Sequence, residues 1–449
     1  MHSSANRVFI ALIFYVFALF YISYWVEQHQ FSPIFITYGI SFLSFLYCFK
    51  HRNALTERNW YIVLLIIFCV PLFSAPSLSP DVYRFFWDGE LVTNGIHPFR
   101  YLPKEVIQDN SIIHQSDYMQ QLYHQMTDLS KKNYTVYPTF MQFFFLVVAA
   151  ITQSTFTAFI VMRLLMIIVL LIGARYVKKL LKICELPSSN ALFLMLNPII
   201  VIETIGNFHF EAIMLSFLFI GIYYALRHKW VLSALFWALV INLKLTPLIL
   251  LPFFLRFFGW KKSVPFYAYT SLFTVGLLII SVWPNSIAHF GQSLSLYFNN
   301  FEFNAGIFYA SKWIFSGFTE QNPTLVIGPL LSIISFLTIL FLAFYRSIDS
   351  PKEWLKRMMF GYIVLLLLST TVHPWYIILP LGFAVFNTSI SLLTWSFLIM
   401  LSYSFYSLGN SMWEFILIGI EYISFLFLLF LPENNTIIKK SKEWLKIDA

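Results

Sequence analysis

The feature that most constrains this chain is a succession of apolar runs, most of them long enough to cross a lipid bilayer. Of its 449 residues, 59% are hydrophobic and only 11% are charged. Continuous apolar runs favour helices, whereas a membrane barrel needs alternating ones. We therefore predict an all-α fold, a polytopic transmembrane helical bundle. Its expected spans are 8–26, 34–49, 60–75, 190–205, 209–226, 230–243, 246–258, 265–283, 324–345, 357–372, 375–387, 389–407 and 413–431.

Clusters of basic residues set the expected orientation. They occur at 50–58, 175–182, 227–229, 256–262, 346–357 and 439–446, and such clusters face the cytoplasm. All of these clusters can face the cytoplasm only if the apolar region 134–175 crosses the membrane an odd number of times. One piece, 137–152, is therefore expected to be partial, re-entrant or interfacial. The prediction is about fourteen spans in the plasma membrane, with both termini inside and the first apolar run retained as an anchor.

The same topology puts the unusual polar segments on the outer face. We expect a single transmembrane domain, 1–449, with a first outer loop at 76–133 and a second at 284–322. Residues 104–133 are polar enough to form short surface helices. Ionisable residues at a membrane boundary are costly, so their concentration on one face predicts a binding or catalytic site there.

The most informative polar stretch is SPDVYRFFWDGELVTNGIHPFRYLP, at 79–103. Asp81 stands at the end of an apolar run beside several aromatic residues, where shielding from water suits a general base. Taken alone, Asp81 is more often a helix cap, and Asp88 with Gly89 is more often a turn. Arg84 and Asp88 are candidate substrate-binding residues in the same stretch.

A second polar stretch, NPIIVIETIGNFHFEA at 197–212, places four ionisable or amide side chains around a glycine hinge between two spans. Hydrogen bonding to a polyhydroxylated substrate and a purely structural polar network both explain them. A metal site is the weaker interpretation, because one histidine and two glutamates at these spacings match no standard ligand pattern. The candidate binding residues here are Glu203, Asn207, His209 and Glu211.

Four further positions carry charged or aromatic side chains. Lys244 interrupts an apolar run and is the best candidate for a phosphate partner, although snorkelling to headgroups is the alternative. Arg163 lies well inside an apolar run and should pair with a buried carboxylate or support a phosphate. His373 and Tyr137 both precede proline, which makes them turn residues first and candidate walls of a substrate cleft second.

Several of these blocks together resemble the C-type (GT-C) membrane glycosyltransferases that use polyprenyl-phosphate sugars. DVYRFFWDGELVTNGIHPFRYLP looks like the first outer loop of bacterial polyprenol-phosphate-mannose-dependent mannosyltransferases, although Phe99 replaces a tyrosine and Thr139 replaces a second proline. NPIIVIETIGNFHFEA, LKLTPLILLP and HPWYIILPL are similar to later blocks of these enzymes, in the expected order. The extra hairpin before the first loop departs from the commonest arrangement.

The resemblance implies an inverting glycosyltransferase that moves a sugar, with mannose expected, from a polyprenyl-phosphate donor to a lipid or glycan acceptor. Asp81 would be the base at the outer face, and Lys244 would hold the phosphate, helped by Arg84, Arg163 or His373. Neither a metal nor another cofactor is expected, and the basic charge needs no nucleic-acid partner. The alternatives are a transporter or flippase of a lipid-linked sugar, and a polymerase or ligase of surface glycans.

Overall fold

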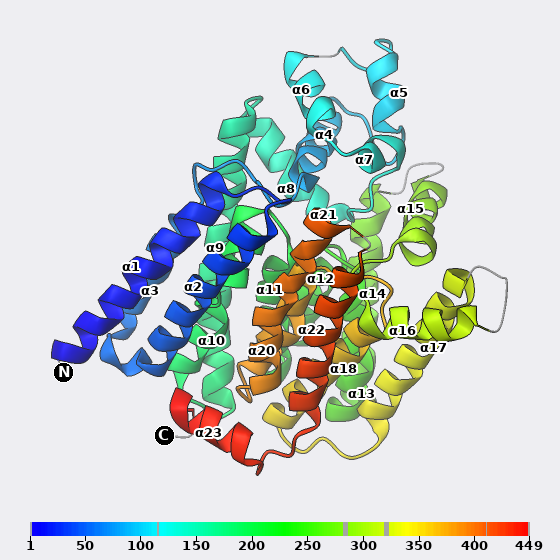
Figure 1. Ribbon diagram of the computed structural model, residues 1–449. Coiled ribbons are helices and arrows are strands. Elements are labelled where there is room, and N and C mark those ends of the chain that lie inside the picture. The colour runs from blue at the N-terminus through cyan, green and yellow to red at the C-terminus, as the bar shows by residue number, and fades with distance from the viewer. Residues whose placement is uncertain (1, 115, 282–285, 318–322, 410, 448–449) are drawn as a thin grey trace.

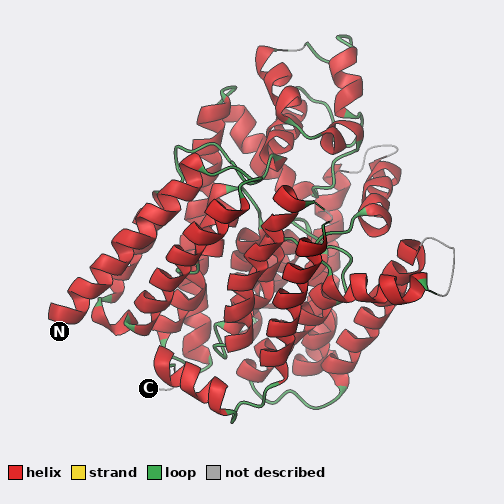
Figure 2. Cartoon of the chain, in the orientation of Figure 1, coloured by secondary structure: helices red, strands yellow, loops and turns green. Residues whose placement is uncertain are grey.

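The computed structural model describes residues 2–114, 116–281, 286–317, 323–409 and 411–447 (Figure 1). Within those residues the chain is helical, with short connecting loops (Figure 2). The strand-like pairing among the described residues is a single parallel β-bridge between Phe303 and Thr371. The prediction of an all-α polytopic bundle is confirmed.

The helices follow one another with few long connections. In the first half they are α1 (His2–Trp25), α2 (Phe31–Lys50), α3 (Glu57–Cys69), α4 (Asp81–Thr93), α5 (Pro103–Gln108), α6 (Asp117–Gln125), α7 (Asp128–Lys132), α8 (Thr139–Ile151), α9 (Thr155–Ile183), α10 (Leu192–Met195), α11 (Glu211–Leu226) and α12 (Trp230–Ile241). In the second half they are α13 (Leu251–Phe258), α14 (Trp260–Ser281), α15 (Ser286–Asn300), α16 (Gly306–Ser316), α17 (Pro323–Phe344), α18 (Pro351–Leu367), α19 (Ile378–Ala384), α20 (Ile390–Leu398), α21 (Phe405–Leu408), α22 (Met412–Phe430) and α23 (Thr436–Leu445).

Six helices in the described part of the chain are long and apolar enough to cross a membrane. They are Ala5–Trp25, Phe31–Lys50, Thr155–Ile183, Pro323–Phe344, Ile390–Leu408 and Met412–Phe430. Large apolar side chains face outward on them, including Phe17, Leu43 and Ile423, as expected of a surface that contacts lipid. Five shorter apolar helices, of 10–17 residues, accompany them. The total of about fourteen spans stays a prediction.

The span expected at 190–205 is not one straight helix. Ser188–Met195 and Ile200–Gly206 are separated by a bend of 63°, and the second piece is a π-helix. Pro198 lies in the break, where it cannot donate the backbone hydrogen bond that would continue the first piece. The expectation for 60–75 is also too long, because α3 ends at Cys69, two residues before Pro71. In both segments the apolar pattern overestimated helix length because a proline lies within the expected span.

The region 134–175 resolves into one short helix and one long helix. α8 has 13 residues and so rises roughly 20 Å, which is short of a hydrocarbon core about 30 Å thick. α9 has 29 residues and is long enough to cross. The expectation that 137–152 is a partial segment agrees with these lengths.

The two chain ends lie near one end of the bundle, and α5, α6 and α7 lie at the other (Figure 1). We call these the terminal end and the loop end. The short surface helices expected in 104–133 are present as α5, α6 and α7. The second expected outer loop forms α15 and α16, and its residues 284, 285 and 318–322 lie outside the described residues.

Arg163, on α9, pairs with no carboxylate among the described residues. Its guanidinium is fully buried and donates hydrogen bonds to backbone carbonyl oxygens at 2.5–3.1 Å. The acceptors are Leu72, Ser74, Ile205 and Gly206. Arg163 therefore joins the segment before α4 to the broken span, and backbone carbonyl oxygens take the place of the expected carboxylate.

Replacing Arg163 by glutamine should destabilise the fold by about 3 kcal/mol, because several buried carbonyl oxygens lose their donors. Thermal unfolding of purified protein in detergent measures this effect. Arg175→Gln is the matched control, since Arg175 is an exposed arginine of the same helix. Equal unfolding temperatures for the two variants would contradict the structural role of Arg163.

Candidate active site

A cavity of about 530 Å³ opens at the loop end of the bundle. Its lining comes from the start of α4, the segment after α7, the turns before α11 and after α12, and the turn before α19. Six of the ten residues predicted as catalytic or substrate-binding line it. They are Asp81, Tyr137, His209, Glu211, Lys244 and His373.

Asp81 is the first residue of α4 and is partly exposed to the cavity. α4 begins there because Pro80 fits the position before a helix and Ser79 accepts a hydrogen bond from the Asp81 amide at 3.4 Å. The N-cap residue is Pro80, and the side chain of Asp81 makes no capping hydrogen bond. Removal from water raises the pKa of Asp81 to about 6; the Ser79 hydroxyl opposes that rise and the Glu211 charge adds to it. A carboxylate with this pKa can accept a proton near neutral pH.

Lys244 supplies the positive charge of the cavity. Its amine lies 2.5 Å from Glu211 and 4.1 Å from the centre of the Tyr376 ring. Burial lowers the pKa of Lys244, but Glu211 and Tyr376 outweigh burial, so the net pKa is raised and the amine stays protonated. It is the only lysine or arginine among the described lining residues. Because an ammonium group has three donors, Lys244 can bind Glu211 and an anionic ligand together.

One wall of the cavity is formed by three rings of a stack of four. Trp375 lies between two imidazoles, with ring centres 3.4 Å from His209 and 4.4 Å from His373. Phe303 extends the stack beyond His373 at 4.6 Å. Burial, together with Lys244, lowers the pKa of His373 to about 3, and burial is also the main cause that lowers the pKa of His209. Both rings are therefore neutral, and they can donate or accept hydrogen bonds without adding charge.

The stack is fixed from behind by a buried carboxylate of α22. The amide of Phe303 donates to the carbonyl oxygen of Thr370, and the carbonyl oxygen of Phe303 accepts from the amide of Val372, just before His373. The next residue, Asn304, donates hydrogen bonds to both oxygens of Glu421 at 3.2 Å. Trp395 also donates to Glu421, at 2.8 Å. Glu421 therefore holds the loop that carries Phe303, and through it the wall that contains His373.

Two predicted binding residues, Arg84 and Asp88, do not line this cavity. They form a buried ion pair at 2.7 Å on α4, and Arg84 also donates to the carbonyl oxygens of Ser130 and Asn133. Gln142 of α8 donates to the second oxygen of Asp88 at 3.0 Å. These contacts attach the segment after α7, which lines the cavity, to α4 and α8.

Glu203 and Asn207 also lie behind the lining rather than in it. Tyr403 donates a hydrogen bond to Glu203 at 2.8 Å, and the other Glu203 oxygen is 3.7 Å from His209. Asn207 accepts from the amide of Leu78 at 3.0 Å, just before Asp81. The structural polar network weighed for this stretch thus describes two of its four residues, and the cavity contains the other two.

Among the lining residues that the sequence did not single out are Trp375 and Tyr376, which directly follow the His373–Pro374 turn, and Tyr406, which falls in an apolar run without any distinguishing signal. The described residues contain no group of three histidine, cysteine, aspartate or glutamate side chains placed to hold a metal ion.

Comparison with known proteins gives two matches. The profile of the family described as "Alpha-(1->6)-mannopyranosyltransferase, N-terminal domain" (MptA_B family) matches residues 16–259. Alpha-(1->6)-mannopyranosyltransferase A from Corynebacterium glutamicum is 23% identical over 203 residues, which is 44% of this chain and 38% of that protein. The aligned region thus spans well under half of the relative. The profile match includes Asp81 and Lys244 and ends before His373.

Proposed function

Because this chain belongs to the MptA_B family of alpha-(1->6)-mannopyranosyltransferases, we propose that it transfers a mannosyl residue from a polyprenyl-phosphate donor to a hydroxyl of a lipid or glycan acceptor. The observation that carries the proposal is the shared cavity. It brings a carboxylate of raised pKa, a protonated amine and neutral imidazoles together at one end of a membrane bundle. We assign this loop end to the outer face of the plasma membrane, following the positive-inside pattern.

In the proposed reaction the acceptor hydroxyl gives its proton to the Asp81 carboxylate. The acceptor oxygen forms a bond to the anomeric carbon as the bond from that carbon to the phosphate oxygen breaks, with inversion. The polyprenyl phosphate leaves with the bonding electrons, and its growing negative charge is stabilised by Lys244. His373 and His209 donate or accept hydrogen bonds at the sugar or phosphate, and Glu211 keeps Lys244 in place.

The proposal is tested by incubating purified protein with radiolabelled polyprenyl-phosphate mannose and a lipid extract. A new labelled product, separable from the donor, is expected. A flippase of the same donor would move it between leaflets without breaking the sugar–phosphate bond. Protection of intact donor in reconstituted vesicles, with no product, would therefore favour the transporter alternative.

The pKa of Asp81 predicts the pH dependence of transfer. The base works only when deprotonated, and its raised pKa of about 6 means that it takes up its proton nearer to neutrality than an ordinary aspartate does. Activity should therefore be full above about pH 7 and fall about tenfold by pH 5. Initial rates at saturating donor measure this, with unfolding temperature followed at each pH as the control. A flat profile down to pH 5 would exclude Asp81 as the base.

A further inference from the structure

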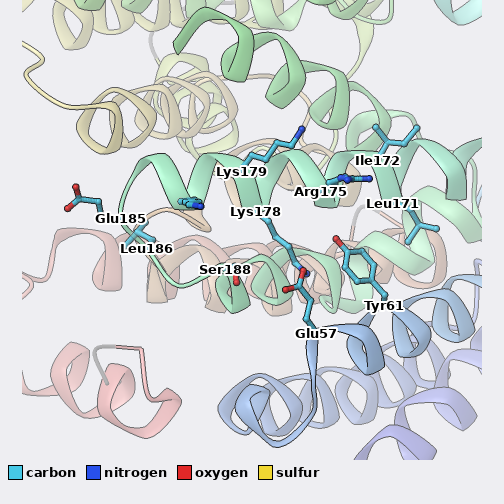
Figure 3. A pocket seen from close by; sticks show the side chains of 11 residues that line it. Glu57, Tyr61, Leu171, Ile172, Arg175, Lys178, Lys179, Glu185, Leu186 and Ser188 are labelled. Atoms are coloured by element: carbon cyan, nitrogen blue, oxygen red, sulfur yellow. The ribbon is translucent and has the colours of Figure 1, made fainter. Parts of the chain in front are cut away.

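A second groove lies along the second half of α9 (Figure 3). That half of α9 leads to α10, towards the terminal end of the bundle (Figure 1). The volume of the groove is about 920 Å³, and its walls are α9, the start of α3 and the segment after α9. It shares no lining residue with the cavity described above. The basic cluster at 175–182, which indicates the orientation of the chain in the membrane, therefore also lines a groove.

The groove carries an excess of positive charge. Four cations line it against two carboxylates, Glu57 and Glu185, which leaves a net charge of +2. Successive cations are three, one and three residues apart, so they follow adjoining rows on the surface of α9. They are Arg175, Lys178, Lys179 and Lys182.

Two of the cations are held by neighbours. Lys178 points towards α3, where its amine is 2.9 Å from Glu57 and 4.1 Å from the ring centre of Tyr61 (Figure 3). Lys179 points the other way and lies over the rings of Tyr176 and Tyr223, at 4.2 and 5.0 Å. Their ammonium groups are thus preorganised in fixed positions.

The other two cations are available. Arg175 and Lys182 are exposed, and the described part of the chain gives neither of them an ion pair. α9 is about 43 Å long, so several of its residues extend beyond a hydrocarbon core of about 30 Å. Leu171 and Ile172 line the groove one to two turns before Lys178, on the side towards the hydrocarbon core. The groove therefore offers cations at headgroup depth and apolar side chains next to the acyl region.

We propose that this groove binds the headgroup of an anionic phospholipid of the cytoplasmic leaflet. The phosphate would pair with Arg175 and Lys182, and the acyl chains would lie along Leu171 and Ile172. If these basic residues only fixed the orientation of the chain in the membrane, exposed positive charge on the cytoplasmic side would be enough. That role would not need a formed groove with an amine fixed between Glu57 and Tyr61, or apolar side chains at the adjoining depth.

The test is the unfolding temperature of the purified protein in phosphatidylcholine nanodiscs, with and without phosphatidylglycerol. Phosphatidylglycerol should raise the unfolding temperature of the unmodified protein by about 3 °C or more. The double variant Arg175→Gln/Lys182→Gln should lose that rise while unfolding like the unmodified protein in phosphatidylcholine alone. If the double variant does not fold, Lys182→Gln alone replaces it in the test, and phosphatidylglycerol should then raise the unfolding temperature by less than in the unmodified protein.

Lys439→Gln/Lys440→Gln is the matched control, because it removes the same charge from exposed positions of α23 at the terminal end. This control should keep the full response to phosphatidylglycerol. Equal responses from both double variants would overturn the proposal in favour of general surface charge, and so would the absence of any response in the unmodified protein. A rise of the same size with inorganic phosphate in phosphatidylcholine would overturn the assignment to a lipid.

Discussion

Asp81→Asn should lower the turnover number of mannosyl transfer about a thousandfold and leave the fold intact. Asparagine keeps the shape of the side chain but cannot accept the acceptor's proton, and a positioned base contributes about two to four orders of magnitude. Because the Asp81 side chain does not cap α4, its replacement should leave the helix in place. The measurements are single-turnover transfer, donor binding and unfolding temperature on the same preparation.

The matched control for this variant is Asp109→Asn, which changes an exposed aspartate of the same loop region outside the cavity. It should transfer mannose at the normal rate. If Asp81→Asn loses expression or unfolds early, the residue is structural and the assigned role is wrong. If it folds, binds donor and transfers normally, the proton is taken by another group.

Replacing Lys244 is expected to have the second largest effect, because no other lysine or arginine among the described lining residues can meet the phosphate. The single change would leave the Glu211 carboxylate, whose side chain is 4% exposed, without its partner, and a buried unpaired charge destabilises a fold by itself. The informative variant is therefore Lys244→Gln/Glu211→Gln, in which an amide pair keeps a hydrogen bond. We expect about a hundredfold loss in kcat/KM, with weaker donor binding.

The control for the double variant is Lys312→Gln/Glu302→Gln. These residues form another lysine–glutamate pair, at 2.7 Å, whose members do not line the cavity. Removing that pair should leave donor affinity unchanged. An unchanged affinity in the Lys244/Glu211 variant as well would show that the phosphate is held elsewhere, and Arg84, just behind the cavity wall, would become the next residue to replace.

The sequence was most informative where one physical cause dominates. Long apolar runs such as 8–26 and 413–431 became helices, because a backbone in lipid must satisfy its own hydrogen bonds. Polar residues at span ends, such as Asp81 and Lys244, lie in one cavity, because short turns at the same membrane boundary are brought together by packing of the spans.

Prediction failed where the partner of a side chain lies far along the chain. Arg163 binds backbone carbonyl oxygens, which no pattern of residue types reveals. Arg84 and Glu203 are as polar as the lining residues, yet Arg84 pairs with Asp88 of its own helix and Glu203 binds Tyr403. Which way such side chains point depends on packing angles that periodicity does not give. Tyr406 carries no mark that separates a cavity wall from a lipid-facing aromatic.

The contact between Asn304 and Glu421 has a consequence for how the protein is made. Glu421 belongs to α22, so it leaves the ribosome and enters the bilayer after all the residues that line the cavity. Until then the loop with Phe303 lacks its anchor, and the rings around Trp375 cannot settle into their final order. A nascent chain released before Met412 would therefore hold all the lining residues of the cavity without the carboxylate that anchors the Phe303 loop.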